Sequence, residues 1–445
     1  MSEARTSVAG QDVNGLASGG ITGITVGGFK SIATTQSIEV RPLTILSGAN
    51  SSGKTSFLQP LLLLKQTLEA TYDPGPLLLY GPNVKFTSGE QLLSRVPRQA
   101  PADGFEVGIR VGRDHDVKVF LGHEQRKGFH VERTTYKLFG GAVSLELRAG
   151  MSAAQLKKQH PGPVPAGGGD LEPRVVRDRC FLVRKYGHSE GDQPSVPHPE
   201  QLSWFLPHIE GLIHVPGLRG NPERVYPVTG VGPRFPGTFE KYVASVIARW
   251  QSEGDGASLT DLNRQMANIG LASRVAAMPI SEAQVELRVP RLLRSERDES
   301  DDLVNIADAG LGVSQTLPVL VALLAAKPGQ AVYIEQPEIH LHPRAQVRLA
   351  DVLAEAAKRG VRVIAETHSS LLLQAVQTLV AKGELDPDLV KLHWFVRNEA
   401  DGSTEVRSAN LDEEGAYGDW PTDFDDVELN SAKEYLDAAE ARSRA

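Results

Sequence analysis

The stretch GANSSGKT, residues 48–55, decides the fold because it has the full G-x-x-x-x-G-K-T spacing of a phosphate-binding loop (P-loop). The apolar residues 43–46 before it predict a short buried strand, and the leucine-rich residues 57–64 after it predict the apolar face of a helix. A strand, a glycine-containing loop and a helix N-terminus together aim backbone N–H groups and a helix dipole at a polyphosphate. We therefore expect Lys54 to reach the β- and γ-phosphates and the Thr55 hydroxyl to ligate Mg²⁺.

Composition narrows the class of protein. The chain has 445 residues, of which 40% are hydrophobic and 23% charged, which indicates a soluble α/β protein with an insertion or two domains. Its net charge of -8 gives no overall basic surface for nucleic acid, so DNA binding would need a local patch. Cys180 is the only cysteine, which excludes an intrachain disulfide and fits a reducing, cytoplasmic compartment. No apolar run approaches the roughly 20 residues of a membrane span, so we expect no membrane insertion.

The last third of the chain carries a second group of motifs. Residues 331–334 predict a buried strand that ends at Glu335, where an α/β nucleotide site places an acid for Mg²⁺. Residues 361–365 predict another buried strand, and His368 just past it can contact a γ-phosphate. Gly-Val-Ser-Gln, residues 312–315, begins an apolar helix whose first N–H groups form a second potential anion site. Each feature alone is more often a simple cap or surface residue, but their order along the chain favours a functional interpretation.

This order of P-loop, Gly-Val-Ser-Gln signature, acidic strand and strand-end histidine resembles ABC-type ATPases of the SMC and OLD-like branch. Residues 28–32 look like the "NFKSI" entry of that branch, residues 334–343 like its "IEEPEIHLHP" segment, and residues 366–370 like "ETHS". Residues 218–226 and 420–424 are similar to stretches of bacterial AAA-type predicted ATPases, which have a C-terminal domain of unknown function. The resemblance implies an α/β P-loop NTPase of the ABC/SMC head type, with a mixed sheet, an antiparallel β region and a mostly helical insertion.

In such ATPases two heads associate head-to-tail, and each ATP is sealed by the signature of the other head. The resemblance implies that ATP and Mg²⁺ are the cofactors, and it assigns residues to four roles. The ATP-binding residues would be Gly48, Ala49, Asn50, Ser51, Ser52, Gly53, Lys54, Thr55 and Ser56. The signature residues acting in trans would be Gly312, Ser314 and Gln315, the metal-site residues Thr55, Glu335 and Gln91, and the catalytic residues Glu338, Gln336 and His368.

One position departs from the pattern. Transporter-type cassettes have a water-orienting glutamate directly after the Mg²⁺ acid, and here that position is Gln336. An amide can orient water but is a poor general base. Two alternatives follow: either Glu338 takes the role, or Gln336 orients water and turnover is slow. The second alternative makes ATP mainly a dimerisation switch.

These features predict five segments: a disordered tail at 1–20, an N-terminal ATPase half at 21–150, an insertion at 151–300, a C-terminal ATPase half at 301–395 and an extension at 396–445. The predicted function is an ATP-hydrolysing homodimer in bacterial DNA maintenance, DNA repair or antiviral defence, with a protein effector or double-stranded DNA as partner. The alternative is an ATP-gated switch that controls an effector. A nuclease would need a metal at Asp423, Asp425, Asp426 and Glu428, but the chain after His368 is too short for a full nuclease domain.

Overall fold

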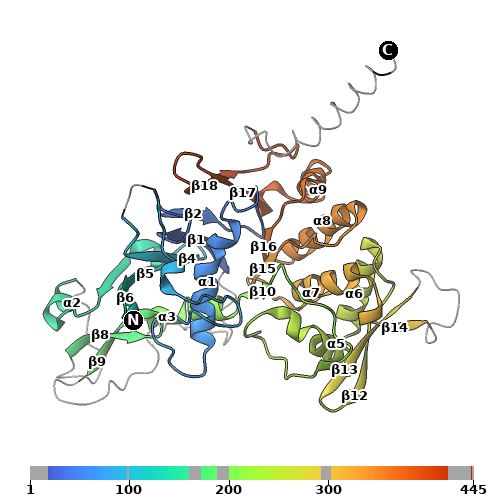
Figure 1. The fold of residues 1–445 in the computed structure, drawn as a ribbon, viewed down its shortest axis with the longest axis horizontal. Coiled ribbons are helices and arrows are strands. Elements are labelled where there is room, and N and C mark those ends of the chain that lie inside the picture. Colours follow the sequence, from blue (N-terminus) through green and yellow to red (C-terminus); the bar gives the residue numbers. More distant parts are fainter. Residues whose placement is uncertain are drawn as a thin grey trace, which may run out of the picture.

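Two six-stranded sheets organise the fold in the computed structural model, which describes residues 19–97, 100–159, 172–187, 200–291, 302–418 and 442. One sheet is antiparallel and the other carries the P-loop strand. Helix α1 (Lys54–Glu69) follows the P-loop, and its leucines share one apolar core with both sheets. Figure 1 shows α1 beside the antiparallel sheet, with the helices of the second half of the chain on the opposite side. The predicted mixed α/β fold is confirmed.

The nucleotide sheet has the strand order β10-β15-β16-β3-β17-β18. All neighbouring strands are parallel except the edge pair β17 and β18, so the carboxyl ends of five strands meet at one edge. The register pairs Glu335 with Glu366 and Glu366 with Leu46. The strands are β3 (Leu43–Gly48), β10 (Ile213–Val215), β15 (Ala331–Glu335), β16 (Arg362–Glu366), β17 (Val390–Arg397) and β18 (Thr404–Ala409).

The antiparallel sheet has the order β2-β1-β4-β5-β6-β7. The alternation predicted from the sequence is real here: Val107, Ile109, Val117 and Val119 are all buried, and the residues between them are more polar or small. The strands are β1 (Ile21–Gly27), β2 (Gln36–Glu39), β4 (Gly104–Val111), β5 (His115–Glu124), β6 (Gly128–Leu138) and β7 (Val143–Arg148). The short 3₁₀ turns η2 (Gly89–Gln91) and η3 (Phe139–Gly141) precede and follow its long strands.

Three helices of the C-terminal half pack on the nucleotide sheet and form a second core. They are α7 (Leu311–Ala325), α8 (Pro343–Lys358) and α9 (Ser370–Ala381). Helix α8 buries Ala345, Leu349 and Leu353 at helical spacing, and Pro343 at its first turn costs no hydrogen bond because that N–H would be unpaired anyway. The two cores therefore lie on opposite faces of the nucleotide sheet, whose alternate residues point to one or the other.

The segment predicted as one insertion is divided by the nucleotide sheet. Residues before β10 add a hairpin and short helices to the antiparallel side: α2 (Ala153–Gln159), β8 (Glu172–Asp178), β9 (Phe181–Gly187), α3 (Glu200–Ser203) and α4 (Leu206–Glu210). Strand β10 itself joins the nucleotide sheet beside β15. Residues after it form a helix pair and a small sheet on the other side: β11 (Tyr226–Pro227), η4 (Phe239–Tyr242), α5 (Val243–Ser252), α6 (Gly256–Ile269), β12 (Ala276–Ser281), β13 (Gln284–Pro290), β14 (Leu303–Asn305) and η5 (Ile306–Asp308).

Strand β18 lies within the predicted extension at 396–445 and pairs with β17, which follows the turn η6 (Pro387–Leu389). Residues 1–18 of the predicted tail at 1–20 lie outside the described residues, as do the stretch 420–424 and the acidic cluster Asp423, Asp425, Asp426 and Glu428. Among the described helices, none combines the length and the apolar character that crossing a bilayer requires.

Candidate functional site

The P-loop joins β3 to α1 and depends on two glycines with left-handed backbone. Gly48 has φ +141° and Gly53 has φ +105°. A Cβ at Gly48 would lie 2.4 Å from the Phe395 carbonyl oxygen, and one at Gly53 would lie 2.5 Å from the Thr404 hydroxyl oxygen. Only glycine fits both the backbone angle and the space at these positions. Thr404 of β18 also donates to the Ser52 carbonyl at 2.7 Å, so the sheet edge holds the loop in place.

Lys54 points into its own loop. Its Nζ donates to the carbonyl oxygens of Gly48 and Ala49, each at 2.9 Å, and the side chain is buried. Burial lowers the pKa of Lys54 to about 8, although the charges of Glu366 and Glu338 act in the opposite direction. The amine is therefore already positioned where an anion between these backbone groups would meet it.

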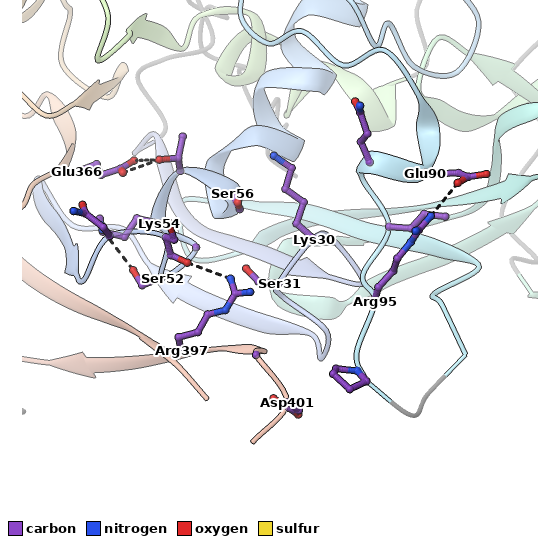
Figure 2. Close-up of a pocket in the computed structure, with 18 of the residues that line it drawn as sticks. Lys30, Ser31, Ser52, Lys54, Ser56, Glu90, Arg95, Glu366, Arg397 and Asp401 are labelled. Atoms are coloured by element: carbon purple, nitrogen blue, oxygen red, sulfur yellow. Dashed lines mark hydrogen bonds and ion pairs between the residues drawn. The ribbon is translucent and has the colours of Figure 1, made fainter. Parts of the chain in front are cut away.

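A cavity of about 1140 Å³ opens in front of the P-loop, and we call it the P-loop cavity. Figure 2 shows Lys30, Lys54 and Arg397 on its walls together with the acidic side chains of Glu366, Glu90 and Asp401. The cavity also brings in Gln91, Gln336 and His368, three residues that the sequence assigned to the site from distant parts of the chain. The P-loop residues on its wall are Asn50, Ser51, Ser52, Gly53, Lys54, Thr55 and Ser56.

Glu366 is an acid that contacts the P-loop threonine, and it was not among the predicted site residues. The Thr55 hydroxyl lies 2.7 Å and 2.9 Å from the two carboxylate oxygens of Glu366, and Tyr333 donates its hydroxyl to Glu366 Oε2 at 2.8 Å. Burial raises the pKa of Glu366, while the hydrogen bonds from Thr55 and Tyr333 partly offset this. Its position at the end of a predicted buried strand was the available sequence signal, whereas the pairing of that strand with β3 is a finding of the structure.

Glu335, the acid predicted to serve Mg²⁺, has other partners. His214 of β10 contacts its Oε1 at 2.9 Å, and the Gly217 N–H donates to its Oε2 at 3.1 Å. Burial alone would raise the pKa of Glu335, but these hydrogen bonds bring it below its ordinary value. Glu335 is also not among the residues that line the P-loop cavity. Its role as a metal ligand stays a prediction.

Glu338 and His368 lie next to each other beside the P-loop. The backbone N–H of His368 donates to Glu338 Oε1 at 2.8 Å, whereas Glu338 Oε2 is buried without a hydrogen-bond partner. Both residues line a smaller cavity of about 490 Å³ with Gly48, Ala49 and Gln336. Burial lowers the pKa of His368, and the charge of Lys54 adds to this effect. A buried carboxylate oxygen without a partner is costly unless something else, such as a water, pairs with it.

Gln336 has an unusual backbone, with φ +45° directly after β15. Its N–H donates to the Glu366 carbonyl at 2.8 Å, and its side chain lines both cavities beside the P-loop. A left-handed conformation at a non-glycine residue costs of the order of 1 kcal/mol or more and tends to occur at functional sites. Both candidates for the water-orienting role, Gln336 and Glu338, therefore lie near the P-loop, and the choice between them stays open.

Gln91 reaches the P-loop cavity from η2. Its amide accepts from the Thr87 N–H at 3.1 Å and donates to the Thr87 hydroxyl at 3.0 Å, and the side chain is exposed. These two bonds are local, so the side chain can be released from them at small cost. The predicted metal-sensing role of Gln91 stays a prediction.

The signature residues lie at the start of α7, outside the P-loop cavity. Ser314 is partly exposed and donates only to the Leu311 carbonyl, at 3.2 Å. Gln315 differs from the expectation of a contact in trans, because its side chain is buried and its amide donates to the Gly220 carbonyl at 2.7 Å. Gly312 packs near the His340 carbonyl, with 3.4 Å to an added Cβ. Ser314 is thus better placed than Gln315 to contact a second chain.

Arg219 was missed as a site residue, although it lies in the stretch 218–226 that carried part of the resemblance. Its guanidinium is buried and donates to the carbonyl oxygens of Gln315, Glu335 and Gln336 at 3.0, 2.7 and 3.2 Å. Burial lowers the pKa of Arg219 to about 10. The Arg219 side chain thus connects the signature helix by hydrogen bonds to the turn that contains Gln336.

The chemistry of these donors fits Mg²⁺ and a nucleotide. Mg²⁺ prefers oxygen ligands and usually takes only one or two from the protein, with phosphates and waters supplying the rest. Thr55 and the acids at the strand ends offer such oxygens. Within the part of the chain that the structure describes, no group of three or more His, Cys, Asp or Glu side chains is arranged to hold a metal by itself.

Residues 207–374 match the model of a protein family described as "AAA domain, putative AbiEii toxin, Type IV TA system". This segment is therefore similar to the AAA domains of that family. The AAA domain match covers β10, the signature helix, β15, β16 and His368, and it starts after the P-loop, so the rest of the chain supplies the P-loop and β3. The stretch 420–424 lies beyond the match, and the predicted C-terminal domain stays a prediction.

Solved structures similar to this chain include heads of SMC proteins. One is an Smc head bound to the C-winged helix domain of ScpA, with 14% identity, 88% of this chain and 98% of that chain covered, and a TM-score of 0.49. The SMC head domain from Thermotoga maritima has 13% identity. The match covers 87% of this chain and 98% of that chain, and its TM-score is 0.41. An Smc head with an extended coiled coil, bound to the C-terminal domain of ScpA and derived from Pyrococcus furiosus, has 12% identity. The match covers 95% of this chain and 99% of that chain, and its TM-score is 0.49. No curated protein matches the chain.

Proposed function

We propose that this protein is a Mg²⁺-dependent ATPase that binds ATP in the P-loop cavity. The observation that carries the proposal is the convergence on one cavity of the P-loop lysine, an acid at a neighbouring strand end, Gln336 and His368. Lys54 and the backbone N–H groups of the loop would neutralise the phosphates, while Mg²⁺ would be held by the Thr55 hydroxyl and a strand-end acid. Sequence expectation names Glu335 as that acid and Gln91 as the residue that senses the metal.

Hydrolysis in such a site depends mostly on positioning and charge neutralisation. A water attacks the γ-phosphorus, the bond from that phosphorus to the β–γ bridging oxygen breaks, and ADP and phosphate leave. Glu338 or Gln336 would orient the water, and His368 would contact the γ-phosphate. Because Gln336 is a poor base, we expect slow turnover if it alone holds the water.

We further propose that two copies associate head-to-tail around two ATP molecules, with Ser314 of each copy contacting the nucleotide bound by the other. Support comes from the partly exposed start of α7, which lies outside its own P-loop cavity, and from Leu311, a residue that is 47% exposed there. The unpaired N–H groups of a helix start suit a phosphate of a second chain. Buried Gln315 would support the helix start rather than touch that nucleotide.

The biological role we propose is that of a cytoplasmic head in bacterial DNA maintenance or antiviral defence, acting on double-stranded DNA or on a protein effector. The family description of residues 207–374 names a putative toxin of a toxin–antitoxin system, which is compatible with a defence role. The alternative is a switch with little turnover, in which ATP drives dimerisation and the dimer controls the effector. The glutamine at position 336 is the observation that favours this alternative.

Steady-state ATP hydrolysis by the full chain, with Mg²⁺ and with or without double-stranded DNA, tests the proposal. Lys54→Ala should abolish turnover, while Lys127→Ala, which removes an exposed lysine from a hairpin turn, should leave it unchanged. Stimulation by DNA would point to a DNA-sensing role. ATP binding without turnover above the Lys54→Ala level would favour the switch, and no ATP binding by the unmodified chain would overturn both versions.

A further inference from the structure

We propose that Glu366, and not Glu335, is the carboxylate that holds Mg²⁺ beside Thr55. This inference rests on the proposed ATP site and deepens it by naming the metal ligand. It also gives Glu335 a different task, which is to fix the end of β15 through His214. Four features of the described residues carry it: the Thr55 contact, the strand order, the bonds of Glu335 and the charge around Lys54.

The first feature is the contact between Glu366 and Thr55. The hydroxyl of the P-loop threonine is the protein oxygen that ligates Mg²⁺ in P-loop nucleotide sites. Here that hydroxyl lies within hydrogen-bond distance of both oxygens of Glu366, at 2.7 Å and 2.9 Å. An ion bound to Thr55 would therefore have this carboxylate among its nearest oxygen donors.

The second feature is the strand order. Strand β16, which ends at Glu366, pairs directly with β3, whereas β15, which ends at Glu335, is one strand further away. Tyr333 of β15 donates to Glu366 Oε2 at 2.8 Å and so fixes the orientation of the carboxylate from behind. Glu366 lines the P-loop cavity and Glu335 does not.

The third feature is that both oxygens of Glu335 are already bonded. The Gly217 N–H donates to Oε2 at 3.1 Å, and His214 Nε2 lies 2.9 Å from Oε1. The amide nitrogen of Asn83 is 3.2 Å from His214 Nδ1, so Nδ1 accepts and Nε2 carries the proton that it donates to Glu335. His214 is almost fully buried, so moving Glu335 to a metal would leave a buried imidazole N–H without its partner.

The fourth feature is electrostatic. The negative charge of Glu366 acts on Lys54 next to the phosphate position, so ATP entering without a cation meets a buried carboxylate as well as the lysine. Mg²⁺ between Glu366 and the phosphates would remove that repulsion. Glu366 thus makes ATP binding depend on the metal, and its neutral isostere should relax the dependence.

The test compares ATP affinity with and without the metal in the full chain. A fluorescent ATP analogue is titrated in Mg²⁺ and in EDTA, and Mn²⁺ binding in the presence of ATP is followed separately by electron paramagnetic resonance. We expect Glu366→Gln to bind ATP more tightly than the unmodified chain in EDTA, to lose most of the tightening by Mg²⁺, and to weaken Mn²⁺ binding at least about tenfold. Glu335→Gln should keep both the tightening by Mg²⁺ and the Mn²⁺ affinity.

Controls are needed because a variant could misfold, or the ATP site itself could be absent, and neither result would bear on the choice between Glu366 and Glu335. Far-UV circular dichroism and thermal melting check each variant, and Glu366→Asp replaces Glu366→Gln if the amide does not fold. Glu366→Asp keeps the charge and should keep part of the Mg²⁺ effect. Loss of the Mg²⁺ effect in Glu335→Gln, or its retention in Glu366→Gln, overturns the inference while the ATP site stands. If the unmodified chain binds no ATP in either buffer, the proposed function fails and this inference falls with it.

Discussion

Arg219 donates a hydrogen bond to the carbonyl oxygen of Gln315 at 3.0 Å, and this contact joins the start of the signature helix to the acidic strand. The same guanidinium donates to the carbonyl oxygen of Glu335 at 2.7 Å. In a head-to-tail dimer these two segments would face different ATP molecules, the signature serving the partner's nucleotide and the turn after β15 serving its own. Arg219 is therefore placed to keep the two sites in a fixed relation within each copy.

Replacing Arg219 tests this link. Arg219→Met removes three hydrogen bonds to buried carbonyl oxygens, so we expect a loss of roughly 2–4 kcal/mol in the free energy of unfolding. Where the variant still folds, ATP turnover should fall more than ATP affinity, because the loop that binds the phosphates is not touched. Urea unfolding and parallel ATP binding and hydrolysis assays measure these effects. Arg224→Ala, which removes an exposed ion pair with Asp308, serves as the control and should change neither quantity appreciably.

Ser314 and Gln315 are neighbours with opposite expected effects. Ser314→Ala should leave the stability of the single chain and its ATP binding nearly unchanged, and should reduce ATP-dependent dimerisation seen by light scattering. Gln315→Ala leaves the Gly220 carbonyl without its donor inside the protein, so it should lower the free energy of unfolding by about 1–3 kcal/mol. Equal loss of dimers in the two variants at equal stability would contradict a separate role in trans for Ser314.

The substitution Gln336→Glu tests which residue orients the attacking water. A carboxylate next to the γ-phosphate position can act as a general base, and such catalysis typically contributes 10²–10⁴-fold, so we expect kcat to rise by at least about tenfold. ATP affinity should change little, because Gln336 does not belong to the P-loop. A turnover rate that stays the same in Gln336→Glu but falls in Glu338→Gln would assign the role to Glu338.

His393 predicts how stability depends on pH. This buried residue of β17 bonds through both ring nitrogens, to Ser408 Oγ and to the Glu39 carbonyl, each at 2.8 Å, and burial lowers its pKa to about 4. The unfolded chain binds a proton near pH 6.5 and the folded chain does not, so its contribution is complete above pH 6.5 and declines as pH falls toward 4. The slope is at most about 1.4 kcal/mol per pH unit.

Urea unfolding between pH 8 and 5 measures this slope, with His393→Gln as the comparison. The variant should be less stable at pH 8, where the histidine contacts are intact, and its stability should fall less steeply below pH 6.5. Equal slopes in the two proteins would contradict the predicted titration. His208, whose pKa burial also lowers to about 4, contributes with the same sign and is present in both proteins.

The parts of the site that depend on chain-local geometry could be predicted from sequence. The P-loop needs its two glycines and a following helix, and the short apolar runs before Glu335 and Glu366 predicted two buried strands. Strand alternation between residues 105 and 148 also predicted the antiparallel region that the structure has. Each of these inferences used residues that are adjacent along the chain, where periodicity carries the information.

Partners that come from distant segments could not be predicted in the same way. Glu335 and Glu366 each end one of two neighbouring strands. The residues around them in the sequence do not show that Glu366 contacts Thr55 or that His214 contacts Glu335. That distinction depends on strand order, which sets β16 and not β15 next to β3. Strand β10 was not predicted for a different reason: a three-residue strand is too short to show a period.

The placement of β3 has a consequence for how the protein is made. Both hydrogen-bonded neighbours of this strand are synthesised more than 300 residues later, because β16 begins at Arg362 and β17 at Val390. Contacts between such distant segments can form only after the intervening chain has been built, and closing long loops makes folding slow. On the ribosome the phosphate loop would thus stay incomplete until nearly the whole polypeptide has emerged, and an unfinished chain could not bind nucleotide.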